Sequence, residues 1–439
     1  GTALSQMIVS GFGHTRRLLE HLQRGSDWDD CGVLQLAFNA KEAERQAQLA
    51  AAFPADLVHQ LDQQQAEARA GVALEHGGLF YPEGGWVHPP ALCQWQAAHP
   101  SVQLLSHREA VELRKVDDQW QAWDGESLLA SAPLVVLAGA AEIKRFAQSA
   151  ELPLKRIRGQ ITRLPQTADS QCLSTVVCAE GYVAPARLGE HTLGASFDFH
   201  SDDLTPTTAE HLGNLEMLKE ISTDLVTRLH ADQLDPQQLQ GRAAFRCTSP
   251  DYLPIVGPLA DRQAFIEAYA ALARDARQVP DIACPWLEGL YVNSGHGSRG
   301  LITAPLSGEL LAAWLENEPL PLPRSVAEAC HPNRFALREL IKGKAGDGLL
   351  DSYPIERMAF ARRLVATTDQ VFTFATADGS IANLMRTRLA PVLIPRLAAF
   401  RAARGLLFRT VSQLSLNYRL MPLSFGSAGH VQGGDRMPW

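Results

Sequence analysis

Two short apolar stretches, far apart in the chain, constrain the fold most strongly. Residues 134–140 are hydrophobic up to Leu137 and then end in three small residues, and residues 290–294 form a second run of this kind. Such runs are typical of strands buried on both faces of a parallel sheet. The Ala-Gly-Ala end of the first run predicts close approach of another backbone or a ligand at the carboxyl edge, where open α/β sheets bind cofactors.

The segment between these two runs has a different pattern. Strand-like alternation predicts mostly antiparallel pairing in residues 155–257, with one helix near residues 208–229. The predicted strands there are residues 155–164, 175–184, 191–199 and 240–246. The sequence therefore predicts an α/β protein with a mixed antiparallel sheet, in which a second domain interrupts a discontinuous cofactor domain.

The flanking regions predict further elements of both kinds. Residues 4–23 and 41–53 are expected to form helices, residues 31–38 a strand, and residues 77–89 a loop rich in glycine and aromatic rings. That loop is either shaped around a ligand or a structural cluster of turns. Residues 109–116 and 120–123 predict a β-meander, and residues 305–315 a helix.

Composition limits the class of protein. The chain has 439 residues, of which 46% are hydrophobic and 20% charged, as in a soluble globular protein with a sizeable core. Its net charge of -8 offers no global attraction for nucleic acid, so a polyanion would need a local basic patch. No apolar stretch approaches the roughly 20 residues of a membrane helix. The missing initiator Met indicates a fragment.

The cysteines indicate a reducing compartment. All seven are scattered and none forms a pair with metal-ligand spacing, so we expect reduced thiols in a cytoplasmic protein and no metal site. His88, His200 and His296 are each isolated from a ligand-spaced partner, which agrees with that expectation.

A glycine loop precedes the last predicted helix. Residues 295–300 match G-x-G-x-x-G, but they do not open a βαβ unit with an acidic residue about 20 positions on, as a dinucleotide fingerprint requires. The loop is either a tight structural turn or a source of N–H groups for a cofactor ring that gains negative charge. The candidate cofactor-binding residues are Ala138, Gly139, Gly295, His296, Gly297, Ser298, Arg299, Gly300 and Leu301.

Arg246 and Tyr182 are the candidate catalytic residues. Arg246 ends a predicted strand, and its planar guanidinium suits a carboxylate. Its alternative role is an ion pair with Asp251. Tyr182 either presents a phenol to the same cleft or packs as an ordinary strand residue.

With these residues in view, positions of about 4–344 resemble a known family. They are similar to the FAD-dependent oxidoreductase half of bifunctional bacterial tRNA-modifying enzymes, in the D-amino-acid oxidase and glycine oxidase-like superfamily. Arg246, Asp251, Pro254 and Gly257 have that superfamily's spacing. The segments with the greatest similarity are residues 11–17, 31–38, 77–90, 155–164, 194–203, 246–257 and 291–311.

The resemblance implies a reaction and its partners. FAD would oxidise the glycine unit of a carboxymethylaminomethyl uridine at the tRNA wobble position, and the products would be the aminomethyl base and glyoxylate. Arg246 would hold the carboxylate, Tyr182 would help to close the pocket, and the glycine loop would face the flavin. A methyltransferase domain would be supplied by another chain. The basic residues Lys155, Arg156, Arg158 and Arg163 would contact tRNA phosphates or form a solvated strand face.

The resemblance also implies a division into domains. Residues 1–40, 100–150 and 284–344 would form a partial FAD-binding domain that lacks the N-terminal βαβ element for the FAD pyrophosphate. Residues 41–99 and 151–283 would form the substrate domain. Residues 345–439 resemble the mainly helical C-terminal part of FAD-dependent aromatic hydroxylases. An aromatic hydroxylase and a non-catalytic fragment are therefore the alternative functions.

Overall fold

The computed structural model describes residues 2–273, 280–342, 427–428 and 431–432. Two compact units are defined, Gly1–Leu272 with Arg277–Arg338, and Ala273–Ala276 with Glu339–Trp439. In the second unit, β17 (Ser427–Ala428) pairs with β18 (Val431–Gln432). Most of the predicted hydroxylase-like segment, residues 345–439, lies outside the described residues. The first unit contains all the candidate site residues.

An eight-stranded sheet forms one half of the first unit. Its strand order is β14-β10-β13-β12-β11-β2-β4-β3, and every pairing is antiparallel except that of β11 with β2. The strands are β14 (Gln240–Thr248), β10 (Lys155–Pro165), β13 (Glu190–Gly194), β12 (Tyr182–Val183), β11 (Val176–Cys178), β2 (Val33–Leu36), β4 (Gly78–Tyr81) and β3 (His59–Leu61). The predicted mostly antiparallel arrangement is confirmed.

The predicted loop at residues 77–89 is wrong over β4 and β5 (Trp86–Val87). Leu79 and Phe80 pair with β2 and are buried in the core, so the aromatic residues there complete a sheet. β5 pairs with β1 (Trp28–Asp29). The glycines permit these close strand approaches, since an added Cβ on Gly78 would overlap the carbonyl of Gln35.

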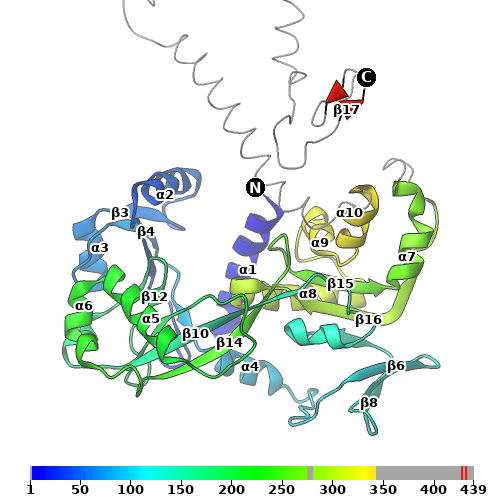
Figure 1. The fold of residues 1–439 in the computed structure, drawn as a ribbon, viewed down its shortest axis with the longest axis horizontal. Coiled ribbons are helices and arrows are strands. Elements are labelled where there is room, and N and C mark those ends of the chain that lie inside the picture. Colours follow the sequence, from blue (N-terminus) through cyan, green and yellow to red (C-terminus); the bar gives the residue numbers. More distant parts are fainter. Residues whose placement is uncertain (1, 274–279, 343–426, 429–430, 433–439) are drawn as a thin grey trace, which may run out of the picture. The chain divides into compact units, whose positions relative to one another are not determined.

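One face of the eight-stranded sheet carries a hydrophobic core. α3 (Gln63–Ala70), α5 (Thr208–Ile221) and α6 (Thr223–Arg228) cover this face, and Figure 1 shows α5 and α6 against the strands. The single helix predicted over residues 208–229 is divided at Ser222, whose hydroxyl caps α6 by accepting from the Leu225 N–H. The opposite face of the sheet is free of these helices and carries the candidate catalytic residues.

A second sheet contains the two apolar runs. Its order is β15 (Ile255–Ala260), β16 (Trp286–Ser294) and β9 (Val135–Leu137), with β16 and β9 parallel. The predicted strand at residues 134–140 is shorter than expected and is not buried on both faces. Leu134 and Val136 are 48% and 43% exposed, and among the described strands β9 pairs only with β16, at an edge of the sheet.

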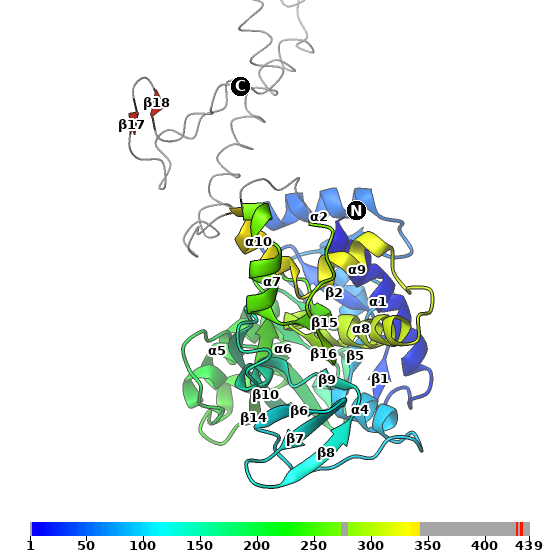
Figure 2. The ribbon, with the colours of Figure 1, turned by 90° about the vertical axis from the view of Figure 1, so that its right-hand side faces the viewer.

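Layers cover both faces of this second sheet. The meander β6 (Glu112–Val116), β7 (Gln119–Trp123) and β8 (Leu128–Ala132) lies on one side, with Trp120 Nε1 donating to the Glu288 carbonyl at 2.8 Å. α1 (Ala3–Leu19), α8 (Gly300–Leu315) and α9 (Arg324–Cys330) lie on the other side (Figure 2). The predicted meander is confirmed.

α8 begins five residues earlier than the predicted start at Pro305, so the proline lies inside the helix. A contact from α1 compensates for the hydrogen bond that the proline cannot make. Proline lacks an N–H, so the Leu301 carbonyl loses its partner within the helix. The Thr15 hydroxyl donates to that carbonyl instead, at 2.9 Å. α1 approaches closely because Gly11 faces α8, where an added Cβ would overlap the Ile302 carbonyl.

The remaining helices complete the first unit. They are α2 (Ala40–Ala52), α4 (Pro89–Ala97), α7 (Arg262–Ala268) and α10 (Arg334–Lys342), the last of which continues into the second unit. All seven cysteines lie in the described part of the chain and none is in a disulfide. Among the described residues, no helix has the length and apolar character needed to cross a membrane.

Candidate active site

Strand register brings Arg246 and Tyr182 to the same face of the eight-stranded sheet. Arg246 on β14 is paired with Ile157 on β10, and Tyr182 on β12 is paired with Gly194, whose other partner is Ile161. Paired residues share a face, as do residues two apart along a strand. Both side chains therefore point away from α5, and the positive charge of Arg246 influences the pKa of the Tyr182 phenol.

Arg246 has an unusual environment for a half-buried cation. Its Nη1 donates to the Ser196 carbonyl at 3.2 Å, and its Cζ lies 4.2 Å from the centre of the Phe197 ring. Among the residues that the structure describes, no carboxylate pairs with it. Burial lowers the pKa of Arg246, which reflects the cost of holding this charge away from water. A guanidinium in this state favours a bound anion.

The alternative partner of Arg246 is engaged elsewhere. Asp251 accepts hydrogen bonds from Arg334 Nη2 and Nε, each at 3.0 Å, and Arg338 lies 3.4 Å away. These two arginines lower the pKa of Asp251 against the opposing effect of burial. The interpretation of Arg246 as an ion-pair partner of Asp251 is therefore wrong.

The glycine loop adjoins the end of β14, close to Arg246. Thr248, two residues beyond Arg246, forms an isolated bridge with His296, and an added Cβ on Gly297 would lie 3.3 Å from the Thr248 hydroxyl. α8 begins at Gly300 without a side-chain cap, so its first N–H groups have no capping side chain. These groups and the helix dipole favour negative charge at this end of the loop.

The small residues after β9 meet the same loop. Leu137 is paired with Val292 in parallel register, and the Ser294 hydroxyl donates to the Ala140 carbonyl at 3.0 Å. Ala138 and Gly139 are exposed beside this contact. The structure thus brings together all the segments that carry candidate cofactor-binding residues, at the carboxyl ends of β9 and β16.

The His296 side chain connects the glycine loop to β16 and α8 through hydrogen bonds at both of its ring nitrogens. Its Nδ1 is 2.9 Å from the Thr303 hydroxyl and its Nε2 is 2.9 Å from Asn293 Oδ1, so both ring nitrogens have protein partners. Burial lowers the pKa of His296 to about 4, which keeps the ring neutral. The ring nitrogens of His296 are therefore engaged within the protein.

The buried His296 predicts an acid-dependent loss of stability. Its folded pKa of about 4 lies below the ordinary value of 6.5, so the unfolded chain binds more protons between these values. This contribution to the free energy of unfolding is complete above 6.5 and is lost as the pH falls toward 4. We expect His296 to account for about 2 kcal/mol of lost stability between about pH 7 and about pH 5.

Urea unfolding of the unaltered chain and of His296→Gln at both pH values measures this contribution. The variant should be less stable near neutral pH and should lose less stability on acidification. Equal losses in both proteins would contradict the assignment of a buried neutral His296. His21→Gln serves as a control, since that histidine is not buried.

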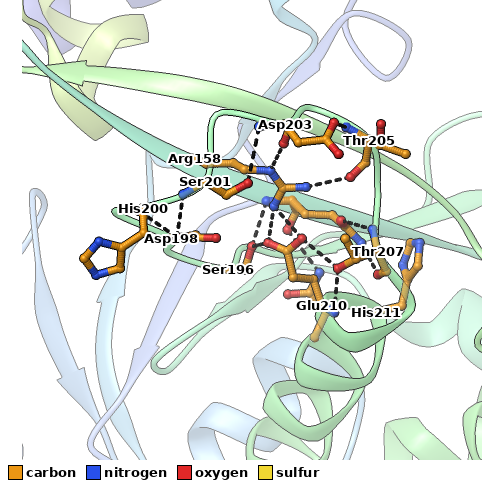
Figure 3. A network of polar contacts seen from close by, with 12 residues as sticks. Arg158, Ser196, Asp198, His200, Ser201, Asp203, Thr205, Thr207, Glu210 and His211 are labelled. Carbon is orange, nitrogen blue, oxygen red and sulfur yellow. Dashed lines mark hydrogen bonds and ion pairs between the residues drawn. The ribbon is translucent and has the colours of Figure 1, made fainter.

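The three arginines of the predicted basic run are paired with carboxylates. Arg158 is 2% exposed and its guanidinium pairs with Glu210 on α5, as Figure 3 shows. Phosphate contact by Arg158 is therefore wrong, because alternation along β10 places it on the core face. Arg156 pairs with Glu142 and Asp202, and Arg163 pairs with Glu190 at 3.0 Å. For these two, the interpretation as a solvated strand face agrees with their exposure.

Three residues beside Arg246 were missed by the sequence analysis. Gly159 lies under its guanidinium, since an added Cβ would overlap Nη1, while Ser196 and Phe197 contact it directly. A glycine in the middle of the predicted strand 155–164 was the available signal, because such a glycine marks close approach by another group.

Comparison with known proteins identifies the class. A family profile described as FAD dependent oxidoreductase matches residues 2–314. The chain belongs to this family of FAD-dependent oxidoreductases.

Highly similar relatives have names that refer to tRNA modification. The chain is 83% identical over 345 residues to the tRNA 5-methylaminomethyl-2-thiouridine biosynthesis bifunctional protein MnmC of Pseudomonas fluorescens Pf-5, covering 79% of this chain and 52% of that protein. It is 82% identical over 344 residues to the protein of the same name from strain Pf0-1, with 78% and 52% covered. The chain thus spans about half the length of these curated relatives. They support neither of the two alternative functions.

Solved structures establish the fold. Glycine oxidase from Geobacillus kaustophilus has a TM-score of 0.58 at 18% identity, over 76% of this chain and 84% of that one. Iminodiacetate oxidase from Chelativorans sp. BNC1 has a TM-score of 0.53 at 19% identity, over 73% and 81%. The predicted D-amino-acid-oxidase-like α/β fold is confirmed.

The residues at the carboxyl ends of β9 and β16 fit part of the family's cofactor, FAD. The glycine loop, the uncapped start of α8 and the exposed Ala138 and Gly139 provide N–H groups and open space at one sheet edge. This set fits the ring system of a flavin, whose pyrimidine becomes negative on reduction. Within the described residues, no strand, glycine loop and helix of the kind that binds a pyrophosphate adjoins β9.

Proposed function

We propose that this chain removes the carboxymethyl group from carboxymethylaminomethyl uridine at the tRNA wobble position by FAD-dependent oxidation. The similarity to the MnmC proteins supports the substrate. The observation that carries the chemistry is Arg246, a half-buried guanidinium without a carboxylate partner among the described residues, located beside the glycine loop. The substrate's glycine unit has the carboxylate that this cation would bind.

Arg246 and Tyr182 would hold the substrate's carboxylate. The planar guanidinium donates two parallel hydrogen bonds to a carboxylate and fixes its orientation. Burial raises the pKa of Tyr182, so its phenol stays protonated and can donate a further hydrogen bond. Together they would orient the methylene carbon next to the carboxylate toward the glycine loop.

When bound, FAD supplies a two-electron acceptor for the hydride that leaves this methylene carbon. The C–H bond breaks, a C=N bond forms to the substrate nitrogen, and the nitrogen releases its proton to solvent. Water then adds to the imine, and cleavage of the C–N bond gives the aminomethyl uridine and glyoxylate. The two electrons would pass finally to an external oxidant such as dioxygen.

This proposal assigns different roles to the two sheets. Residues 295–301, Ala138 and Gly139 would hold the flavin ring together with β9 and β16, in the partial FAD-binding domain of residues 1–40, 100–150 and 284–344. The third strand of this sheet, β15 (Ile255–Ala260), lies outside those ranges. The eight-stranded sheet would belong to the substrate domain of residues 41–99 and 151–283, except that its strand β2 (Val33–Leu36) falls within residues 1–40. The partners would be tRNA and a methyltransferase domain, in the cytoplasm.

The direct test of this function uses tRNA that carries carboxymethylaminomethyl uridine. Purified chain with FAD should release glyoxylate, and mass spectrometry of the digested tRNA should show the aminomethyl nucleoside in equal amount. Tight flavin binding without either product would overturn the proposal. Glyoxylate release that requires no NADPH also distinguishes it from an aromatic hydroxylase.

Gly159 provides a prediction about substrate affinity. In Gly159→Ala the new methyl group would overlap Arg246 Nη1 and displace the guanidinium, so we expect KM for the modified tRNA to rise about 10-fold or more. Steady-state kinetics of glyoxylate release measures the change. Gly213→Ala on α5 is the matched control, since its added Cβ meets no atom within 4 Å. Equal KM values in the two variants would contradict the placement of Arg246.

A further inference from the structure

Phe197 is an exposed aromatic residue in a firmly held segment. Its side chain is 57% exposed, although large apolar rings are usually buried in a folded protein. It follows β13 in the chain and lies between Ser196 and Asp198, both of which are bonded to β10. The backbone on both sides of Phe197 is therefore held by hydrogen bonds, and this held backbone leaves the ring exposed.

The contacts that hold this segment are shown in Figure 3. Asp198 forms an isolated bridge with Arg158, with reciprocal backbone hydrogen bonds of 2.9 Å. The Ser196 hydroxyl accepts from the Gln160 N–H at 2.8 Å and donates to Glu210 at 2.6 Å. The guanidinium of Arg158 donates to the Asp203 and Thr205 carbonyls farther along. The buried pair of Arg158 and Glu210 thus fixes the segment from the core side.

This anchoring also determines where the Phe197 ring points. Ser196 and Asp198 face α5 with Gln160 and Arg158, so the intervening Phe197 faces the other side, with Arg246. The guanidinium of Arg246 lies 4.2 Å from the ring centre and covers part of the ring. The exposed part of the ring therefore directly borders the proposed carboxylate site.

We propose that Phe197 stacks on the pyrimidine ring of the substrate nucleoside, which rests on the proposed function of the Arg246 site. Proteins recognise unpaired RNA bases by stacking them on aromatic side chains. The uracil ring is joined to the carboxylate by a short chain of single bonds, so a substrate bound at Arg246 presents its base nearby. Phe197 would then select a nucleoside over a free N-substituted glycine.

The test separates base recognition from carboxylate recognition. Isothermal titration calorimetry would measure the Kd of 5-carboxymethylaminomethyl uridine and of N-methylglycine for the full chain, without oxygen and with FAD that has been chemically reduced beforehand, so that neither ligand is oxidised. We expect Phe197→Leu to weaken binding of the nucleoside by about 10-fold or more and to leave binding of N-methylglycine within about twofold. Phe197→Trp should restore nucleoside binding, and Phe53→Leu, at another exposed phenylalanine, should change neither Kd.

Three results would overturn the inference. They are an unchanged nucleoside Kd in Phe197→Leu, an equal loss for both ligands, and no binding of the nucleoside by the unaltered chain. An equal loss would mean that Phe197 acts only by supporting Arg246. Glyoxylate release from modified tRNA decides the proposed function separately, because it can succeed while Phe197→Leu binds the nucleoside normally.

Discussion

Replacement of Arg246 by methionine is expected to raise KM for the modified tRNA about 100-fold or more, with a smaller change in kcat. A charge-assisted bidentate contact to a carboxylate contributes on the order of 3 kcal/mol, and each 1.4 kcal/mol corresponds to about a tenfold change. Methionine removes the charge but keeps an unbranched side chain over Gly159 and beside Phe197. Steady-state kinetics of glyoxylate release measures both constants.

The control for this variant is Arg163→Met on the same sheet. Arg163 is exposed and paired with Glu190 at 3.0 Å, on the strand that separates β14 from β13. Its loss should leave KM within about twofold, because an exposed ion pair contributes little. An Arg246→Met enzyme with the KM of this control would remove Arg246 from the substrate site.

Removal of the Glu210 carboxylate is expected to destabilise the first unit by about 3–5 kcal/mol, because it leaves the Arg158 charge buried and unpaired. Glu210 also accepts hydrogen bonds from the Ser196 and Thr207 hydroxyls, which lower its pKa together with Arg158. Urea unfolding of Glu210→Ala measures the loss.

Two further variants show whether this loss comes from the buried charge. Glu190→Ala breaks the exposed pair with Arg163 and should cost less than about 1 kcal/mol. Replacing both buried partners, as Arg158→Met with Glu210→Leu, should recover much of the stability lost in Glu210→Ala. A loss in Glu210→Ala no greater than that in Glu190→Ala would contradict the buried pair.

The sequence was sufficient to predict the antiparallel sheet and the meander, because alternation reports one buried and one exposed face. It was insufficient for β9, since an apolar run does not reveal how many neighbours a strand has. The run around Val136 has the composition of a central strand, but among the described strands it lies at an edge of the second sheet. The buried role of Arg158 required knowledge of which face of β10 meets α5, and the phase of that strand depends on distant residues.

The candidate site was only partly accessible from the sequence. Arg246 and Tyr182 are 64 positions apart in the numbering, and only the register of β14, β10, β13 and β12 places them on the same face. Strand position and side-chain chemistry made both residues candidates and the resemblance assigned their roles, whereas Gly159 and Phe197 were identified only by their contacts with Arg246.

The visible absorption spectrum of the purified chain tests the central claim most directly. The chain is mixed with FAD, freed of unbound cofactor by gel filtration, and recorded without oxygen before and after addition of tRNA that carries carboxymethylaminomethyl uridine. We predict that flavin absorption is retained by the protein and is bleached by the substrate, more slowly at limiting tRNA in Arg246→Met. A colourless protein, or a bound flavin that the modified tRNA leaves oxidised, would contradict the account.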